Sequence, residues 1–133
     1  MEHSDFLNEL KLIISKAENF SEKARREGIL ALEEELDENN CRDDIYSYGT
    51  RFVIDGTDYG LVDKILSNII SHETDPKVKL LKIIQKEAVL AMQQGMNTRL
   101  LMPLLFSFID GNTLSALKEI LSDNDGRIKE WLE

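Results

Sequence analysis

The sequence has few of the residues that mark disulfide-linked, metal-binding or membrane-spanning proteins. Its single cysteine, Cys41, cannot form an internal disulfide, which favours a reducing cytoplasm. The two histidines, His3 and His72, have no cysteine or carboxylate at ligand spacing, so we predict neither a metal nor a cofactor. The longest apolar run, residues 100–109, is too short to cross a bilayer and contains Pro103. We therefore expect a cytoplasmic protein that does not insert into the membrane.

Positive charge is scarce too. The chain has 16 lysines and arginines against 25 aspartates and glutamates, which gives a net charge of -9. This excess would repel nucleic acid phosphates and anionic lipids, so neither is expected as the main partner. The amino terminus, MEHSDFLNEL, also lacks the basic start and apolar run of a signal peptide. With 133 residues, of which 42% are hydrophobic, the chain can bury one core, and we predict one domain over residues 1–133.

The apolar residues recur at steps of three and four, as in Val78, Leu81, Ile84, Ala88 and Ala91, and no stretch alternates with period two. This spacing predicts an all-α fold, a compact bundle of six to seven helices. Asp-Pro at positions 75 and 76 indicates a helix start. Single glycines and an Asn-Asn pair indicate helix ends. The expected helices span 5–38 (bending near Gly28), 42–55, 58–73, 76–94, 98–110, 113–122 and 126–132.

Two pairs of segments resemble each other within the chain. EGILALE (27–33) aligns with EAVLAMQ (87–93), and IDGTDYGLVDKILSN (54–68) aligns with IDGNTLSALKEILSD (109–123). The similarity predicts two related helical-hairpin halves, about 1–73 and 76–133. Chance similarity between amphipathic helices is the alternative.

No set of residues in the sequence indicates catalysis. A calcium loop over residues 121–132 would need ligands at its first and last positions, but Leu121 and Leu132 cannot ligate. The sequence contains no glycine-rich phosphate loop and no nucleophile elbow, and Cys41 has no histidine nearby in sequence to act as its base. We predict that the protein is not an enzyme.

Three segments resemble the MotA family, the ion-driven stator subunit of the bacterial flagellar motor. KARREGILALEEEL (23–36) and RFVIDGTDYGLVDKIL (51–66) resemble the family's first cytoplasmic region, and KEAVLAMQQGMNTRLLMPLLFSFID (86–110) resembles its carboxy-terminal tail. Two membrane helices separate these regions in the family, whereas only residues 71–79 lie between them here. The chain therefore resembles the cytoplasmic region of MotA without its transmembrane helices.

The resemblance implies a charged partner-binding site. In the family, a basic residue before the glycine and a glutamate after it contact opposite charges on the rotor protein FliG. Arg25 and Glu33 match these two positions, and Arg26 and Glu34 are neighbours that could replace them. The resemblance thus implies a protein that binds the rotor, the stator or itself, close to the flagellar motor at the inner membrane, as a monomer or homodimer. The alternative is a solvated helix face, because Arg26 and Glu33 are seven residues apart and would share one side of a continuous helix.

The apolar run offers a second function. Leu101, Met102, Leu105 and Phe106 are candidates for an apolar contact surface, through which a helical adaptor or scaffold unrelated to the motor would bind its partner. The other interpretation is that the carboxy-terminal helices enclose this run. The residues expected to cover it are Leu114, Leu117, Ile120, Leu121 and Trp131.

Overall fold

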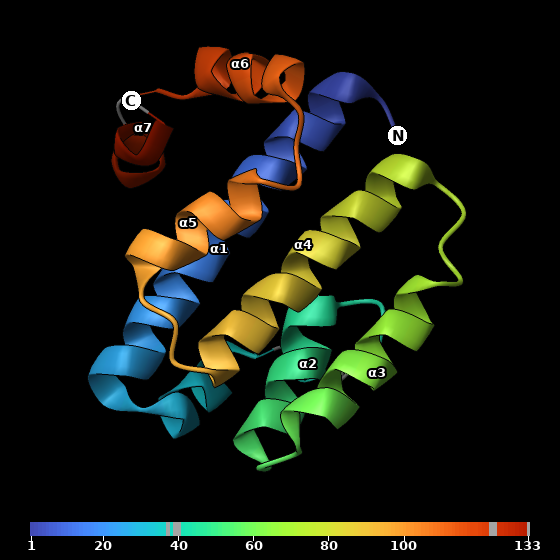
Figure 1. The fold of residues 1–133 in the computed structure, drawn as a ribbon, viewed down its shortest axis with the longest axis vertical. Helices are drawn as coiled ribbons and strands as arrows, with labels where there is room; N and C mark the ends of the chain where they lie inside the picture. Colours follow the sequence, from blue (N-terminus) through green and yellow to red (C-terminus); the bar gives the residue numbers. More distant parts are fainter. Residues whose placement is uncertain (37, 39–40, 123–124, 133) are drawn as a thin grey trace.

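The first helix, α1 (His3–Glu27), extends along most of the molecule (Figure 1). The computed structural model describes residues 1–36, 38, 41–122 and 125–132. Along α1 the buried apolar residues follow the helical repeat, with Phe6, Leu10, Ile13, Ala17 and Phe20 on the inner face. Two arginines in the last turn lie where positive charge is favourable to the helix dipole.

Seven further helical segments follow in the described part of the chain, and that part contains no strand. They are the 3₁₀ helix η1 (Ile29–Glu35), α2 (Ile45–Ile54), α3 (Tyr59–Ile70), α4 (Pro76–Gln93), α5 (Thr98–Phe106), α6 (Gly111–Ile120) and α7 (Gly126–Leu132). The all-α prediction is confirmed. Side-chain caps begin five of these helices: Asp44, Asp58, Asp75, Asn97 and Asp110 each accept a hydrogen bond from a backbone amide of the first turn.

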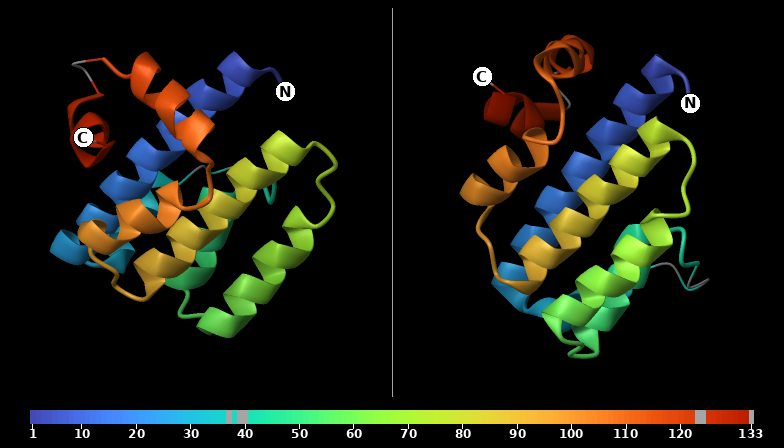
Figure 2. Two further views of the ribbon diagram at one scale, coloured as in Figure 1. Left: turned by 45° about the horizontal axis from the view of Figure 1, so that its top comes forward. Right: turned by 45° about the vertical axis from the view of Figure 1, so that its right-hand side comes forward.

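Helices α1 and α4 lie side by side in the centre of the bundle and run in the same direction (Figures 1 and 2). Helices α2 and α3 pack against α4 on one side, whereas α5, α6 and α7 pack against α1. One hydrophobic cluster contains buried residues from all eight segments. The two segments on either side of Asp75 therefore share one hydrophobic core.

The predicted helix over 5–38, bent near Gly28, is wrong beyond Gly28, because the chain does not continue as an α-helix there. Gly28 has φ 94°, a conformation that an α-helix cannot include, and its amide donates the last α-helical bond, to the carbonyl of Ala24. The chain continues as η1, which inserts the fully buried side chain of Leu32 into the core. Asp37, at the end of the predicted helix, lies outside the described residues.

The first pair of internally similar segments adopts different structures, whereas both segments of the second pair contain the start of an α-helix, α3 or α6. Residues 27–33 include the end of α1 and most of η1, whereas residues 87–93 lie within α4. In the second pair, Asp55 ends α2 but its counterpart Asp110 begins α6. Because Asp110 caps the next helix directly, α6 begins two residues earlier than predicted, and α5 ends at Phe106 rather than at residue 110.

Candidate protein-binding site

The predicted charged residues gather where α1 turns into η1. The turn at Gly28 separates the basic end of α1, with Arg25 and Arg26, from the acidic η1, with Glu33 and Glu34, and all four side chains are exposed. Because the α-helix ends at Gly28, Arg26 and Glu33 do not share one helix face as the continuous helix would have placed them. The site is thus a corner formed by two segments, which we call the Gly28 corner.

On the acidic side, η1 is held against α1 by ion pairs. Lys23 donates hydrogen bonds to the carboxylates of Glu34 and of Glu35, the latter at 2.7 Å. These two hydrogen bonds, the one to Glu34 foremost, raise the pKa of Lys23. The Glu33 side chain makes no hydrogen bond or ion pair with another described residue, so its carboxylate is available to a partner.

On the basic side, the two arginines differ in their surroundings. Arg25 donates from Nη1 to the backbone carbonyl of Gly95 at 2.6 Å and so ties the end of α1 to the turn between α4 and α5. The Arg26 side chain is 71% exposed, and its Nη2 lies 3.7 Å from the Glu27 carboxylate. Arg26 is therefore the freer of the two.

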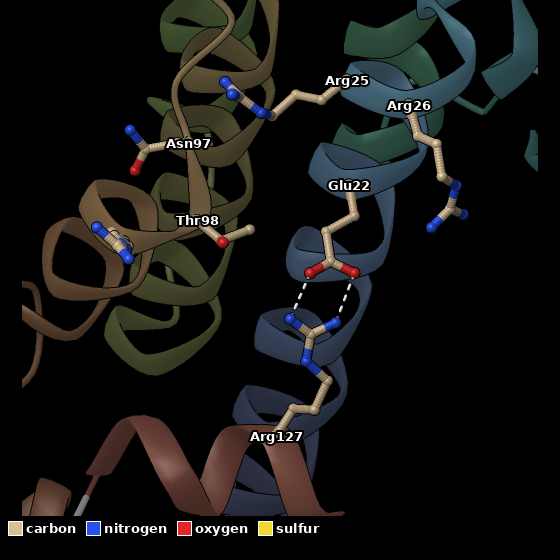
Figure 3. Close-up of a pocket in the computed structure, with 7 residues that line it drawn as sticks. Glu22, Arg25, Arg26, Asn97, Thr98 and Arg127 are labelled. Atoms are coloured by element: carbon tan, nitrogen blue, oxygen red, sulfur yellow. Dashed lines mark hydrogen bonds and ion pairs between the residues drawn. The ribbon is translucent and has the colours of Figure 1, made fainter.

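Next to the corner lies an open depression of about 690 Å³, which we call the arginine depression (Figure 3). It is formed by the end of α1, the start of α5 and the first turn of α7. Its lining residues are Glu22, Arg25, Arg26, Asn97, Thr98, Arg99 and Arg127. Arg25 and Arg26 belong to the predicted site, whereas Glu22, Arg99 and Arg127 were not predicted. The one sequence signal for Arg99 is that it lies in the segment 86–110, which resembles the carboxy-terminal tail of MotA.

Glu22 and Arg127 form a two-point ion pair inside this depression, drawn as two dashed lines in Figure 3. Arg127 Nη1 donates to Glu22 Oε2 at 2.6 Å, and Nη2 faces the second carboxylate oxygen. The hydrogen bond to Glu22 is the main cause that raises the pKa of Arg127. Arg127 Nε also lies 3.3 Å from the buried carboxylate of Glu18, which accepts a hydrogen bond from Trp131. These contacts dock α7 on α1.

The candidate apolar contact residues lie mostly in the core. Leu101, Met102 and Leu105 are fully buried, and Phe106 is half-buried against the core cluster. Of the residues expected to cover them, Leu117 and Leu121 are buried, and Trp131 packs against the cluster. Helix α5 packs against α1 and α4, so Leu101, Met102 and Leu105 form no surface, whereas Leu100 at the start of the run is 60% exposed.

Two features are absent from the described part of the chain. No group of three or more His, Cys, Asp or Glu side chains is placed to hold a metal ion there. No single helix in that part is long and apolar enough to cross a membrane; α5 and α6 meet the length and composition criteria only as a pair, and they are bent by 116°.

The fold and the site define an all-α protein with a charged corner and a basic depression, a type of surface suited to contacts with another macromolecule. The sequence is similar to Motility protein A of Treponema phagedenis, with 34% identity over 86 residues, which is 65% of this chain and 32% of that protein. It is also similar to Motility protein A of Treponema pallidum (strain Nichols), with 32% identity over 84 residues, or 63% of this chain and 32% of that protein.

These matches support a relationship to Motility protein A. The chain spans about a third of the length of the curated relatives it matches. No protein-family model matches the sequence. No solved structure matches it either.

Proposed function

We propose that this protein acts by binding a protein of the flagellar motor, the rotor protein FliG or another rotor or stator component, and that it does so without catalysis. The observation that carries the proposal is the Gly28 corner, where Arg25, Arg26, Glu33 and Glu34 are exposed on two adjoining segments. The similarity to Motility protein A supports motility as the setting. The protein would act in the cytoplasm near the motor, as a monomer or homodimer.

Exposed charges suit a contact that is made and broken repeatedly. Charge pairs at the surface contribute little affinity each, but they orient the partners and speed their encounter. Such a contact weakens as salt screens the charges. Arg26 and Glu33 fit this role best, because the Glu33 carboxylate has no partner among the described residues and the Arg26 guanidinium has one, the Glu27 carboxylate at 3.7 Å.

The proposal is tested by reversing both charges in one variant, Arg25→Glu with Glu33→Lys. Its affinity for purified FliG, measured by titration calorimetry at low salt, should fall about tenfold, because two attractive pairs become repulsive. The difference should shrink when the salt concentration is raised. A second variant, Arg26→Glu, avoids breaking the Arg25 bond to the Gly95 carbonyl.

The matched control reverses two exposed charges elsewhere, Lys64→Glu with Glu119→Lys. Both double variants leave the net charge unchanged, so a loss confined to the first depends on where the charges lie. Equal affinity of the wild type and of the corner variants would reject the Gly28 corner as the binding site. Failure of the wild type to bind FliG or any other motor protein would reject the proposed function.

A further inference from the structure

The arginine depression concentrates positive charge on an acidic protein. Four arginines and one glutamate line it, although the chain as a whole carries a net charge of -9. Like charges repel, so gathering these arginines costs stability unless something negative offsets them. Glu22 and Glu18 pair with Arg127, and Glu27 pairs with Arg26, but Arg25 and Arg99 have no carboxylate partner among the described residues. The depression is therefore a local anion-attracting surface.

Arg99 shows this imbalance most clearly. It is the second residue of α5, so its charge lies at the positive end of the helix dipole, where a cation is unfavourable. Its side chain is exposed and makes no hydrogen bond or ion pair with another described residue. Neither the fold nor a neighbouring carboxylate explains an arginine at this position.

Glu22 shows which chemical group fits the depression. Its carboxylate already meets the Arg127 guanidinium at two points, a hydrogen bond from Nη1 and an ion pair with Nη2, and such two-point contact is how arginine recognises carboxylates best. If this pair opened, the positive charge of Arg127 would still have a negative partner, because its Nε lies 3.3 Å from the Glu18 carboxylate. An incoming carboxylate could thus exchange with Glu22.

The shape and the charges around the depression narrow the kind of partner. Its lining contains no aromatic or aliphatic side chain, and it is open to solvent, whereas small-molecule sites enclose most of the ligand in apolar walls. A nucleic acid would extend its phosphates beyond the depression onto the acidic remainder of the surface. A short acidic segment of a protein places its carboxylates only where the arginines lie.

We infer that the arginine depression binds the carboxylates of an acidic segment in a protein partner, with Arg99 and Arg127 as binding residues and Glu22 as a built-in competitor. This inference rests on the proposed function, because it assigns a partner chemistry to the surface next to the Gly28 corner. It adds residues from α5 and α7 to that surface. It also predicts that removing one particular negative charge strengthens binding.

The test uses the full chain and a fluorescein-labelled oligoglutamate peptide, followed by fluorescence anisotropy at low salt. Arg99→Ala should weaken binding about two- to fivefold, the size expected for one exposed charge pair. Glu22→Gln should strengthen binding about two- to fivefold, because it frees Arg127 and removes the competing charge. Arg42→Ala, an exposed arginine outside the depression, is the matched control and should change nothing.

Two checks keep the result interpretable. The fluorescence of Trp131, the single tryptophan, reports whether α7 remains docked in the Glu22→Gln variant. If α7 undocks in that variant, the comparison of Arg99→Ala with Arg42→Ala still shows whether the depression binds the peptide. A neutral Gly-Ser peptide of the same length measures binding that does not depend on carboxylates.

The inference is overturned if oligoglutamate binds no better than the neutral peptide, or if Arg99→Ala and Arg42→Ala behave alike. It is also overturned if ATP displaces the peptide and binds more tightly, because the site would then belong to phosphate chemistry. The assay contains no FliG. If FliG and the other motor proteins do not bind but oligoglutamate does, the motor role is rejected and the binding of an acidic segment is retained.

Discussion

At the scale of single residues, Gly49 permits the close approach of three helices. A Cβ atom at this position would lie 2.9 Å from Leu66 Cδ1 and 3.1 Å from Val89 Cγ1. Leu66 lies on α3 and Val89 on α4, and both are buried. The hydrogen of Gly49 thus sets how closely α2 can pack on its neighbours, and this packing orients the central helix α4.

We expect Gly49→Ala to lower the free energy of unfolding by about 1 to 3 kcal/mol, the usual cost of overpacking a close-packed core. Alanine favours helix over glycine by about 1 kcal/mol, so a net loss would show that the steric cost dominates. Urea denaturation followed by circular dichroism measures the change. Gly111→Ala is the matched control, because nothing lies within 4 Å of its Cβ and stability should not fall. Equal effects of the two substitutions would contradict the packing argument.

At the scale of elements, the junction between α1 and η1 shows what the sequence could not reveal. Leu32 and Leu36 continue the four-residue spacing of α1, so the pattern predicts a helix through Gly28. The backbone angle of Gly28 ends the helix instead, and no pattern of apolar residues encodes that angle. Leu32 is buried in the structure, and the apolar spacing predicts the same burial for a continuous helix, so hydrophobic spacing cannot distinguish the two arrangements.

Substitution of Gly28 by alanine tests the junction, because the free energy of unfolding should rise if the helix is continuous and fall if it ends at Gly28. In a continuous helix Gly28→Ala would add about 1 kcal/mol of stability. With φ 94° and ψ 157° the substitution should instead remove about 1 to 3 kcal/mol, because residues with a side chain rarely adopt this conformation. No atom lies within 4 Å of the added Cβ, so the loss would come from the backbone alone. A stabilising effect in urea denaturation would favour the continuous helix.

Local chemistry made other elements predictable. The bounds of α4 agree with the prediction to within one residue, because Asp75 caps the helix and Pro76 begins it, and both signals are visible in sequence. The arginine depression could not be predicted in this way, because its residues Glu22, Arg99 and Arg127 come from three helices that are far apart in the sequence. Their proximity depends on how α5 and α7 pack on α1, and no single segment carries that information.

At the scale of the whole molecule, α1 links the parts that come early and late in the sequence. It packs against α4, α5, α6 and α7, and the amino group of Met1 lies 2.7 Å from the Asp75 carboxylate. The segments before and after Asp75 consequently stabilise each other through one core. A change at the Gly28 corner or in α7 therefore acts on the end of the same helix, which gives α1 a central place in any response to a partner.

Acid should weaken the ion pairs that join these parts, and Asp63 provides the clearest case. A hydrogen bond from Lys86, 3.0 Å away on α4, holds the pKa of Asp63 below its ordinary value of 3.8, and Ser67 adds a second hydrogen bond. Because the folded pKa is lowered, the stabilisation is complete above about pH 4 and is lost as pH falls through the folded pKa. Asp63→Asn should reduce the free energy of unfolding by up to about 1 kcal/mol at pH 7, since the carboxylate is 43% exposed and partly screened. Urea denaturation at pH 7 and at pH 3 should show this difference shrinking, because protonated aspartic acid resembles asparagine. A difference that is the same at both values would mean that the Asp63–Lys86 pair does not couple α3 to α4 through charge.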